Sequence, residues 1–185
     1  LRGLGYSVPT PKMYSSERFV PQKRERIFIV GFRDGTQFQF TDIPEKEENP
    51  VLRDILQSKP ADKYTLRDNL WQYHQERKAH HKEKGNGFGY RSFGRGDVAG
   101  TLSARYGKDG ADLLIRQRGK NPRMLTPLEC ARLMGFEGPK EWRQFKIPVS
   151  NPQAYKQFGN AVVPQVVAHI AKDMLFAMTV EVQAD

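Results

Sequence analysis

The stretch that decides the fold reads Arg123-Met124-Leu125-Thr126-Pro127-Leu128-Glu129-Cys130-Ala131-Arg132-Leu133-Met134-Gly135-Phe136. Thr126 and Glu129 have the spacing of a capping box, and Pro127 falls at the first helical position, where its missing N–H costs little. The pattern predicts a helix that ends at Gly135, a usual residue just beyond a helix. Arg132 follows Glu129 by three positions, so we expect the two side chains to pair on one helix face.

A second helix is predicted near the end of the chain. Apolar residues recur there at helical spacing, namely Val163, Val166, Val167, Ile170, Ala171 and Met174. Pro164 falls in the first turn, and Asn160 is expected to be the N-cap, which would place Gly159 and Asn160 at a helix N-terminus. One face of this helix is apolar, and we expect it to pack on another part of the protein.

Upstream, the sequence predicts strands and one further helix. Residues 27–32 form a short apolar run that indicates a buried strand, and residues 6–8 are expected to pair with it in a hairpin at the edge of a larger sheet. Thr65 and Asp68 suggest a capping box for a helix that runs to about Lys82. Residues 113–115 are expected to form a strand after a tight turn.

The charge of the chain is concentrated in one segment. The 185 residues carry a net charge of +9, and residues 74–120 hold 11 Lys+Arg against 5 Asp+Glu, which is +6 of that total. Residues 85–110 contain 8 of the 16 glycines, interleaved with aromatic and basic side chains. This composition favours a polyanionic partner such as nucleic acid. A solvated basic surface and a long flexible loop are the alternatives.

Composition also excludes several classes of protein. A hydrophobic content of 38% and a charged content of 28% are typical of a soluble globular protein. No apolar run has the roughly 18–20 residues of a membrane span, and no signal peptide is recognisable, so we expect a cytoplasmic protein. The single cysteine, Cys130, excludes a disulfide framework, and His80 and His81 lack partner ligands, so no metal site is expected. The chain begins with Leu1 rather than Met, and we expect a fragment.

Three motifs in order carry a family resemblance. Residues 22–26 read Gln22-Lys23-Arg24-Glu25-Arg26 and match Q-x-R-x-R, which is motif VIII of the DNA cytosine-5 methyltransferases. Residues 123–136 resemble motif IX, R-x-L-T-x-x-E-x-x-R-L-x-G-F, and residues 155–163 resemble motif X. The resemblance covers essentially the whole chain and is specific.

The resemblance implies an α/β fold, made of the end of a doubly wound, Rossmann-like methyltransferase sheet and a small irregular α+β target-recognition domain. Residues 1–33 would be the last strands of the catalytic domain with motif VIII, and residues 34–122 the target-recognition domain. Residues 123–145 would be the motif IX helix and loop, and residues 146–185 motif X and the helix that returns to the catalytic domain.

The resemblance also implies an activity and shows what the chain lacks. The family methylates C5 of cytosine in double-stranded DNA with S-adenosyl-L-methionine, after flipping the base out of the helix; bacterial members belong to restriction-modification systems, which places this protein in the bacterial cytoplasm at the nucleoid. The glycine-rich cofactor loop, the Pro-Cys nucleophile and the Glu-Asn-Val motif are missing, so we expect this chain alone to be inactive and Cys130 to be a packing residue. The implied partner is the N-terminal catalytic region, on the same or a separate chain. The alternative is a non-catalytic DNA-specificity subunit of a split methyltransferase.

Motifs VIII and X indicate the residues around the base and the cofactor. By resemblance, Gln22, Arg24 and Arg26 support catalysis, with Arg26 near the flipped cytosine. Arg24 would lie near the phosphate backbone or, as an equal alternative, only support the fold through a carboxylate pair. The cofactor side is assigned to Asn160, Ala161 and Val162.

The region between motifs VIII and IX is similar to that of bacterial methylases that read CC(A/T)GG. Its candidate DNA-binding residues are Lys84, Asn86, Arg91, Thr101, Arg105 and Lys108. Thr101 would steady the phosphate beside the flipped base, while Arg105 and Arg91 are candidate guanine readers because Arg donates to O6 and N7 together. Arg105 is favoured, since the turn at residues 108–110 would hold it, whereas Arg91 falls in a looser stretch. The motif IX helix is expected to be a scaffold, with Arg123 anchoring the recognition region.

Overall fold

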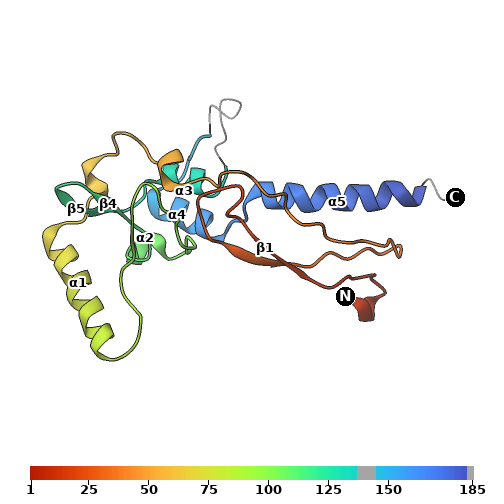
Figure 1. Ribbon diagram of the computed structural model, residues 1–185, viewed down its shortest axis with the longest axis horizontal. Helices are drawn as coiled ribbons and strands as arrows, with labels where there is room; N and C mark the ends of the chain where they lie inside the picture. The colour runs from red at the N-terminus through yellow and green to blue at the C-terminus, as the bar shows by residue number, and fades with distance from the viewer. Residues whose placement is uncertain (137–144, 183–185) are drawn as a thin grey trace.

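The computed structural model describes residues 1–136 and 145–182. It contains the α-helices α1 (Asp68–Glu83), α2 (Tyr106–Asp109), α3 (Pro127–Leu133), α4 (Asn151–Asn160) and α5 (Pro164–Val182). The strands are β1 (Lys12–Ser15), β2 (Glu25–Phe28), β3 (Ser92–Phe93), β4 (Leu114–Gln117) and β5 (Lys120–Arg123), and short 3₁₀ turns lie at Arg2–Leu4, Leu52–Asp54 and Asp62–Tyr64. Figure 1 shows α3, α4 and α2 at the centre, α1 with β4 and β5 on one side, and α5 with the β1–β2 hairpin extending to the other.

The expected α3 helix is present, with its predicted cap. The Glu129 backbone N–H donates to the Thr126 hydroxyl at 3.1 Å, and the Thr126 N–H donates to the Glu129 carboxylate at 2.9 Å. Gly135 follows the helix with φ of 75°, a conformation that a Cβ would strain. Local sequence chemistry therefore defines both ends of this helix.

The core surrounds α3 and α4. Side chains that are fully shielded from solvent or nearly so come from loops, α2, the three-stranded sheet and both central helices, namely Leu52, Ala99, Leu102, Tyr106, Leu114, Leu125, Leu133, Met134 and Ala154. Burial of each leucine or methionine side chain in this set is worth roughly 1.5–3 kcal/mol. The core therefore joins segments from the whole length of the chain.

The expected start of the last helix is wrong. Asn160 is the final residue of α4, a helix that the sequence pattern did not indicate, and α5 begins only at Pro164. The apolar face of α5 is partly as expected, since Val163, Val166 and Ile170 are buried while Val167 is 41% exposed. Gly159 and Asn160 therefore lie at a helix C-terminus and not at an N-terminus.

The N-terminal strands differ from expectation in position and burial. β1 pairs with β2 in antiparallel register, with Met13 opposite Ile27, while residues 6–8 contribute only an isolated bridge from Ser7 to Phe32. Ile27 and Ile29, expected to be buried, are 61% and 58% exposed. The alternation of a strand places them on the face away from the core.

The second sheet lies beside α1. β3 runs parallel to β4, and β4 is antiparallel to β5, which confirms the strand expected at residues 113–115. The capping box at Thr65 is wrong, because α1 begins at Asp68 after Arg67 and the Thr65 hydroxyl instead accepts a bond from Gln117 at 3.0 Å. A tertiary partner thus takes the hydroxyl that the local pattern assigned to the helix.

These two small sheets and five helices give a mixed α and β fold in the described residues. The loop expected after the motif IX helix falls mainly on residues 137–144, which lie outside the described residues.

Residues 151–179 are long and apolar enough for a membrane span, with a mean hydropathy of 1.3 in an 18-residue window, and are the one such stretch in the described residues. From the sequence, no apolar segment of membrane-spanning length had been expected. The stretch is broken between α4 and α5, and the Asp173 carboxylate of α5 accepts bonds from the Thr41 backbone N–H at 2.9 Å and from the Thr41 hydroxyl. One side of α5 is therefore held by polar contacts with the rest of the chain.

Apolar side chains are exposed on the hairpin and on α5. Met13 and Ile27 form an exposed cross-strand pair, and Leu175 and Phe176 of α5 are 62% and 72% exposed. Clusters of this kind mark surfaces that another protein segment covers or that drive association.

We expect residues 1–185, expressed alone, to self-associate at high concentration because these apolar faces are uncovered. The variant Met13→Ser/Ile27→Ser should shift the equilibrium toward monomer in sedimentation velocity runs. Arg33→Ser, a change at an exposed polar side chain, is the matched control. A monomeric chain at millimolar concentration would contradict the prediction.

Candidate nucleic-acid interface

The Gln22 side chain connects three parts of the fold. It is fully buried, its Nε2 donates to the Leu133 carbonyl at 3.1 Å, and its Oε1 accepts from the Leu102 N–H at 2.7 Å. A buried carboxamide that uses both ends needs both partners in place, because an unpaired end costs about 1–3 kcal/mol. Gln22 thereby holds the end of α3 and the backbone at Leu102 to the segment that leads into β2.

Arg24 is buried and bonded to three carbonyls. Its Nη1 donates to Leu102 O at 2.9 Å, and its Nη2 donates to Gly159 O at 2.9 Å and to Ala161 O at 2.6 Å. Burial, together with the charge of Arg26, lowers the pKa of Arg24 to about 10, so the group stays charged at neutral pH. Both Nη groups face protein carbonyls, and of the two alternatives the fold-supporting one fits this geometry, with carbonyls in place of the expected carboxylate.

Arg26, two residues along the strand, is exposed. Its Nη1 donates to the Glu25 carbonyl at 2.7 Å, and its side chain borders a small hollow with Phe28 and Val162. Motif VIII therefore offers one guanidinium to the interior and one to the surface.

Residues 99–104 run beside motif VIII. The Lys23 N–H donates to Ala99 O at 2.8 Å, and the Thr101 hydroxyl donates to Lys23 O at 2.8 Å. Thr101 is half-buried, and its hydroxyl can still accept a bond from a group outside the chain. These hydrogen bonds therefore hold the backbone of residues 99–104 without the help of a ligand.

The glycine-rich stretch docks on α1 rather than hanging free. Lys78 donates to Tyr90 O at 3.0 Å and lies 4.2 Å from the centre of the Tyr90 ring, which also meets the Trp71 ring edge-on at 4.6 Å. Gly89 has φ of 142°, and an added Cβ would lie 2.8 Å from the Lys78 side chain. Glycine is required here for a close approach of two elements.

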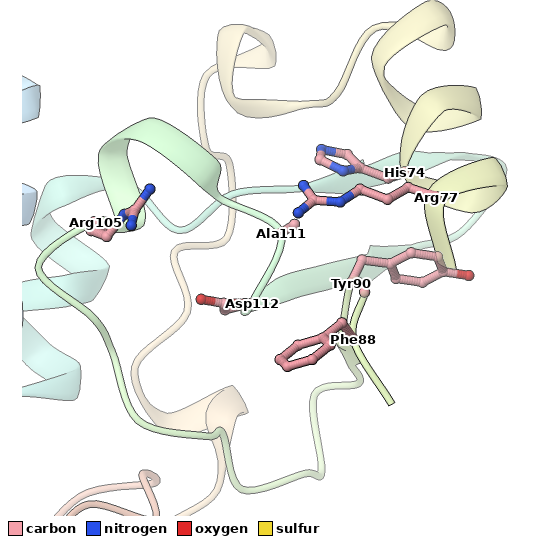
Figure 2. A pocket seen from close by; sticks show the side chains of 8 residues that line it. His74, Arg77, Phe88, Tyr90, Arg105, Ala111 and Asp112 are labelled. Carbon is pink, nitrogen blue, oxygen red and sulfur yellow. The ribbon is translucent and has the colours of Figure 1, made fainter. Parts of the chain in front are cut away.

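A hollow of about 200 Å³ lies between α1, this stretch and the start of α2. Figure 2 shows the side chains of His74 and Arg77, on α1, along one side of the hollow, with Phe88 and Asp112 on other sides of it. Burial, and then the charge of Arg77, lower the pKa of His74, so this imidazole is neutral at pH 7. Arg105 borders the hollow, and Phe88 is 70% exposed.

The candidate DNA-binding residues lie on one continuous stretch of chain with different degrees of constraint. Lys84, Arg91, Arg105 and Lys108 are exposed, and Asn86 is half-buried. Arg91 is more constrained than expected, because its N–H donates to Ala111 O and its carbonyl accepts from Leu114 N, both at 2.9 Å. An added Cβ on Gly100 would lie 2.7 Å from the Arg91 guanidinium, which places that group next to Thr101.

The residues assigned to the cofactor form the junction between α4 and α5. Asn160 and Val162 are exposed and Ala161 is half-buried, and the Ala161 carbonyl is held by Arg24. The Asn160 carboxamide can hydrogen-bond a ligand, and the neighbouring Val162 side chain can contact its apolar part. Together they suit one edge of a pocket for a ligand with polar and apolar parts, such as a nucleoside.

Residues 1–175 match the C-5 cytosine-specific DNA methylase family. The chain belongs to this family. Among curated relatives, it is 44% identical over 178 residues to the Type II methyltransferase M.DsaV of Dactylococcopsis salina, covering 95% of this chain and 49% of the relative. It is 45% identical over 182 residues to M.NlaX of Neisseria lactamica, covering 97% of this chain and 56% of the relative. The chain therefore spans about half the length of these cytosine methylase relatives.

Solved structures share the fold. The Entamoeba histolytica methyltransferase EhMeth has a TM-score of 0.70 at 16% identity, covering 96% of this chain and 56% of that one. The S. pombe Dnmt2 methyltransferase has a TM-score of 0.69 at 17% identity, covering 96% of this chain and 61% of that one. At such identities the likeness concerns the fold alone.

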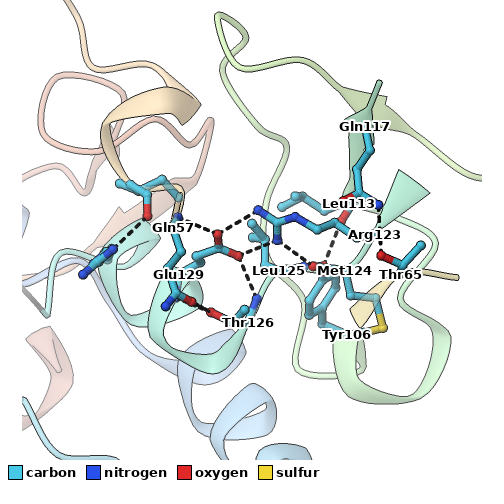
Figure 3. Close-up of polar contacts among 12 residues, drawn as sticks. Gln57, Thr65, Tyr106, Leu113, Gln117, Arg123, Met124, Leu125, Thr126 and Glu129 are labelled. Carbon is cyan, nitrogen blue, oxygen red and sulfur yellow. Dashed lines mark hydrogen bonds and ion pairs between the residues drawn. The ribbon is translucent and has the colours of Figure 1, made fainter. Parts of the chain in front are cut away.

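The sequence did not predict the buried ion pair between Arg123 and Glu129. Figure 3 shows the Arg123 guanidinium facing the Glu129 carboxylate, with Nη1–Oε2 and Nη2–Oε1 distances of 2.7 and 2.8 Å. Glu129 had been expected to pair with Arg132, whose Nη1 donates to the Ile55 carbonyl at 3.4 Å. The Glu129 carboxylate also accepts from Gln57 N at 2.8 Å. The anchoring role expected for Arg123 fits this geometry.

Two aromatic hydroxyls extend this network. Tyr106 OH donates to Leu113 O at 2.8 Å and accepts from Leu125 N at 2.7 Å, and Tyr155 OH donates to Leu125 O at 2.8 Å. Burial raises the pKa of Tyr106 well above its usual value, so it remains a neutral donor. The signal that could have located the network is the presence of Arg123 and Glu129 on either side of the α3 cap.

Cys130 lies within the core beside this network. It is fully buried, and burial raises the pKa of its thiol well above the usual range, which disfavours the thiolate needed for nucleophilic attack. Across the residues described, no three His, Cys, Asp or Glu side chains group as a metal site would require.

We expect Arg123→Met to destabilise the chain by about 3–5 kcal/mol, because it leaves the Glu129 charge buried without a partner. Urea unfolding followed by circular dichroism measures the effect. Lys120→Met, which removes an exposed ion pair with Asp62, should cost little. Equal losses for the two variants would contradict the prediction, and Arg123→Met/Glu129→Met should regain part of the lost stability.

Proposed function

We propose that residues 1–185 are the DNA-reading, C-terminal portion of a bacterial DNA (cytosine-5)-methyltransferase. The observation that carries this proposal is the basic, glycine-rich stretch, which is fixed on α1 by Lys78 and joined through residues 99–104 to motif VIII. A positively charged surface on a rigid support is what phosphate contacts and groove readout both require.

The recognition surface consists of the exposed cations and the hollow beside α1. Lys84 and Lys108 supply phosphate contacts, and Arg105 and Arg91 donate to guanine edges in the major groove. Asn86 and Thr101 contribute polar contacts nearby. The similarity of this region to methylases that read CC(A/T)GG supports a short target of that type.

The motif VIII and motif X residues serve the base and the cofactor. Arg26, the exposed guanidinium of motif VIII, would contact the flipped cytosine, and Gln22 and Arg24 keep its strand in position. Asn160, Ala161 and Val162 close one side of the S-adenosyl-L-methionine pocket. The cofactor supplies the methyl group, and this chain orients the groups around it.

The partner of the exposed apolar faces is the catalytic region that carries the cysteine nucleophile. The exposed Met13–Ile27 pair and the outer side of α5 are the surfaces it would cover, which makes the hairpin the end of a larger, doubly wound sheet. Residues 34–122 are then the target-recognition domain, and the complete protein acts in the cytoplasm at the nucleoid. The same surfaces would serve a DNA-specificity subunit of a split enzyme, and an upstream reading frame that continues into a Pro-Cys motif would exclude that arrangement.

Residues 1–185 alone should transfer no methyl group to duplex DNA, since the nucleophile and most of the cofactor pocket are absent. The measurement is incorporation of tritium from labelled S-adenosyl-L-methionine into a cytosine-rich duplex, with the complete enzyme as the positive control. Incorporation that Cys130→Ser abolishes would show that this buried thiol reacts, against its expected role.

DNA binding should depend steeply on salt. If about four to six phosphates are contacted, the logarithm of the association constant should fall with the logarithm of salt concentration at a slope of about −4 to −5. Lys84→Ala should weaken all sequences alike and reduce the slope by about one. A slope near zero would remove the electrostatic basis of the proposal.

Arg105→Ala should reduce sequence-specific binding of DNA rather than the general electrostatic attraction to it. In fluorescence anisotropy with cognate and scrambled duplexes, we expect a loss of about 1–3 kcal/mol on the cognate site and little on the other. Arg118→Ala, which removes an exposed arginine from the β4–β5 turn, is the control for a general charge effect. Equal losses on both duplexes would assign Arg105 to phosphate binding.

A further inference from the structure

Residues 99–104, here called the central segment, are held from two sides. On one side, Ala99 exchanges backbone bonds with Pro21 and Lys23, and the Leu102 N–H donates to the Gln22 side chain. On the other side lies Gly159 at the end of α4, where an added Cβ would lie 2.4 Å from the backbone of Ser103 and Ala104. The central segment and the end of α4 therefore touch backbone to backbone.

The Arg24 guanidinium joins the same two parts. One Nη group bonds to Leu102 in the central segment, and the other bonds to Gly159 and Ala161 at the α4–α5 junction. A guanidinium is planar and rigid, so its two donor groups cannot move independently. A shift of either part would leave a buried donor or carbonyl unpaired, which is costly.

We propose that Arg24 is a positioning residue that couples DNA binding at the central segment to cofactor binding at residues 160–162. The assignment of DNA to one part and the cofactor to the other rests on the proposed function; the coupling itself rests on the contacts of Arg24 and Gly159. Cofactor binding orders the α4–α5 junction, and Arg24 transmits this order to the central segment. The Thr101 side chain is then already in the position that DNA binding requires. By linkage, DNA tightens cofactor binding by the same factor.

The alternative is that Arg24 only braces the fold. If so, loss of Arg24 would lower the stability of the fold and weaken the binding of both ligands. The ratio of the DNA affinities with and without the second ligand would not change. The ratio is therefore the quantity that separates a positioning role from a structural one.

The test uses the full-length protein or, where the two regions are separate polypeptides, their complex. Dissociation constants for a cognate duplex are measured by anisotropy with and without S-adenosyl-L-homocysteine, and calorimetry measures the reverse direction. In the wild type we expect the product to tighten DNA binding by about fivefold or more. In Arg24→Leu this factor should fall to about one, and Arg24→Lys should keep part of it.

Two further variants separate the explanations. Tyr155→Phe removes a buried hydrogen bond to Leu125 in the same core without touching the contacts of Arg24, so it should leave the factor unchanged. Gly159→Ala keeps Arg24 but forces α4 away from the central segment, so it should abolish the factor even where Arg24→Leu does not fold. Hydrogen exchange should show that the product protects residues 99–104 in the wild type and not in Gly159→Ala.

An unchanged factor in the Arg24 and Gly159 variants, or a wild-type factor of one, overturns the coupling while leaving the proposed function in place. A wild-type protein that binds neither the duplex nor the product overturns both.

Discussion

The buried ion pair between Arg123 and Glu129 is the interaction on which the rest of the structure depends. Taking the two charges out of water costs several kcal/mol per ion, and this cost is offset only where the remaining lone pairs and protons find partners. Here the carboxylate also accepts bonds from the backbone at Gln57 and Thr126. The pair therefore constrains three segments at once: the loop before α1, the end of β5 and the first turn of α3.

From α3 the constraint passes toward the surface. The carbonyl at the end of α3 receives the Gln22 side chain, Gln22 holds Leu102, and Arg24 joins Leu102 to the junction of α4 and α5. The DNA-side and cofactor-side residues thus belong to one connected set of buried hydrogen bonds. A set of this kind rigidifies a site because each unpaired member would carry a desolvation cost.

Local chemistry made part of this predictable. The Thr126–Glu129 capping box, Gly135 and the apolar spacing of α5 depend on residues a few positions apart; the structure has the first two, and three of the expected apolar positions of the last helix are buried. The family resemblance alone was sufficient to locate motif VIII. Asn160 was misplaced because the polar residues of α4 hide a helix whose buried face is formed by only a few side chains, such as Ala154 and Phe158.

By itself the sequence determined the family, the basic recognition stretch and the ends of α3, since each depends on residue types at short, fixed spacing. Only the tertiary structure decided that Glu129 pairs with Arg123, that Thr65 bonds Gln117 rather than capping α1, and that Arg24 faces carbonyls. In each case the sequence offered a polar group more than one possible hydrogen-bonding partner. Burial selected partners that satisfy most of the hydrogen-bonding groups of these side chains, with the Arg24 Nε as an exception, and burial is a property of the folded chain as a whole.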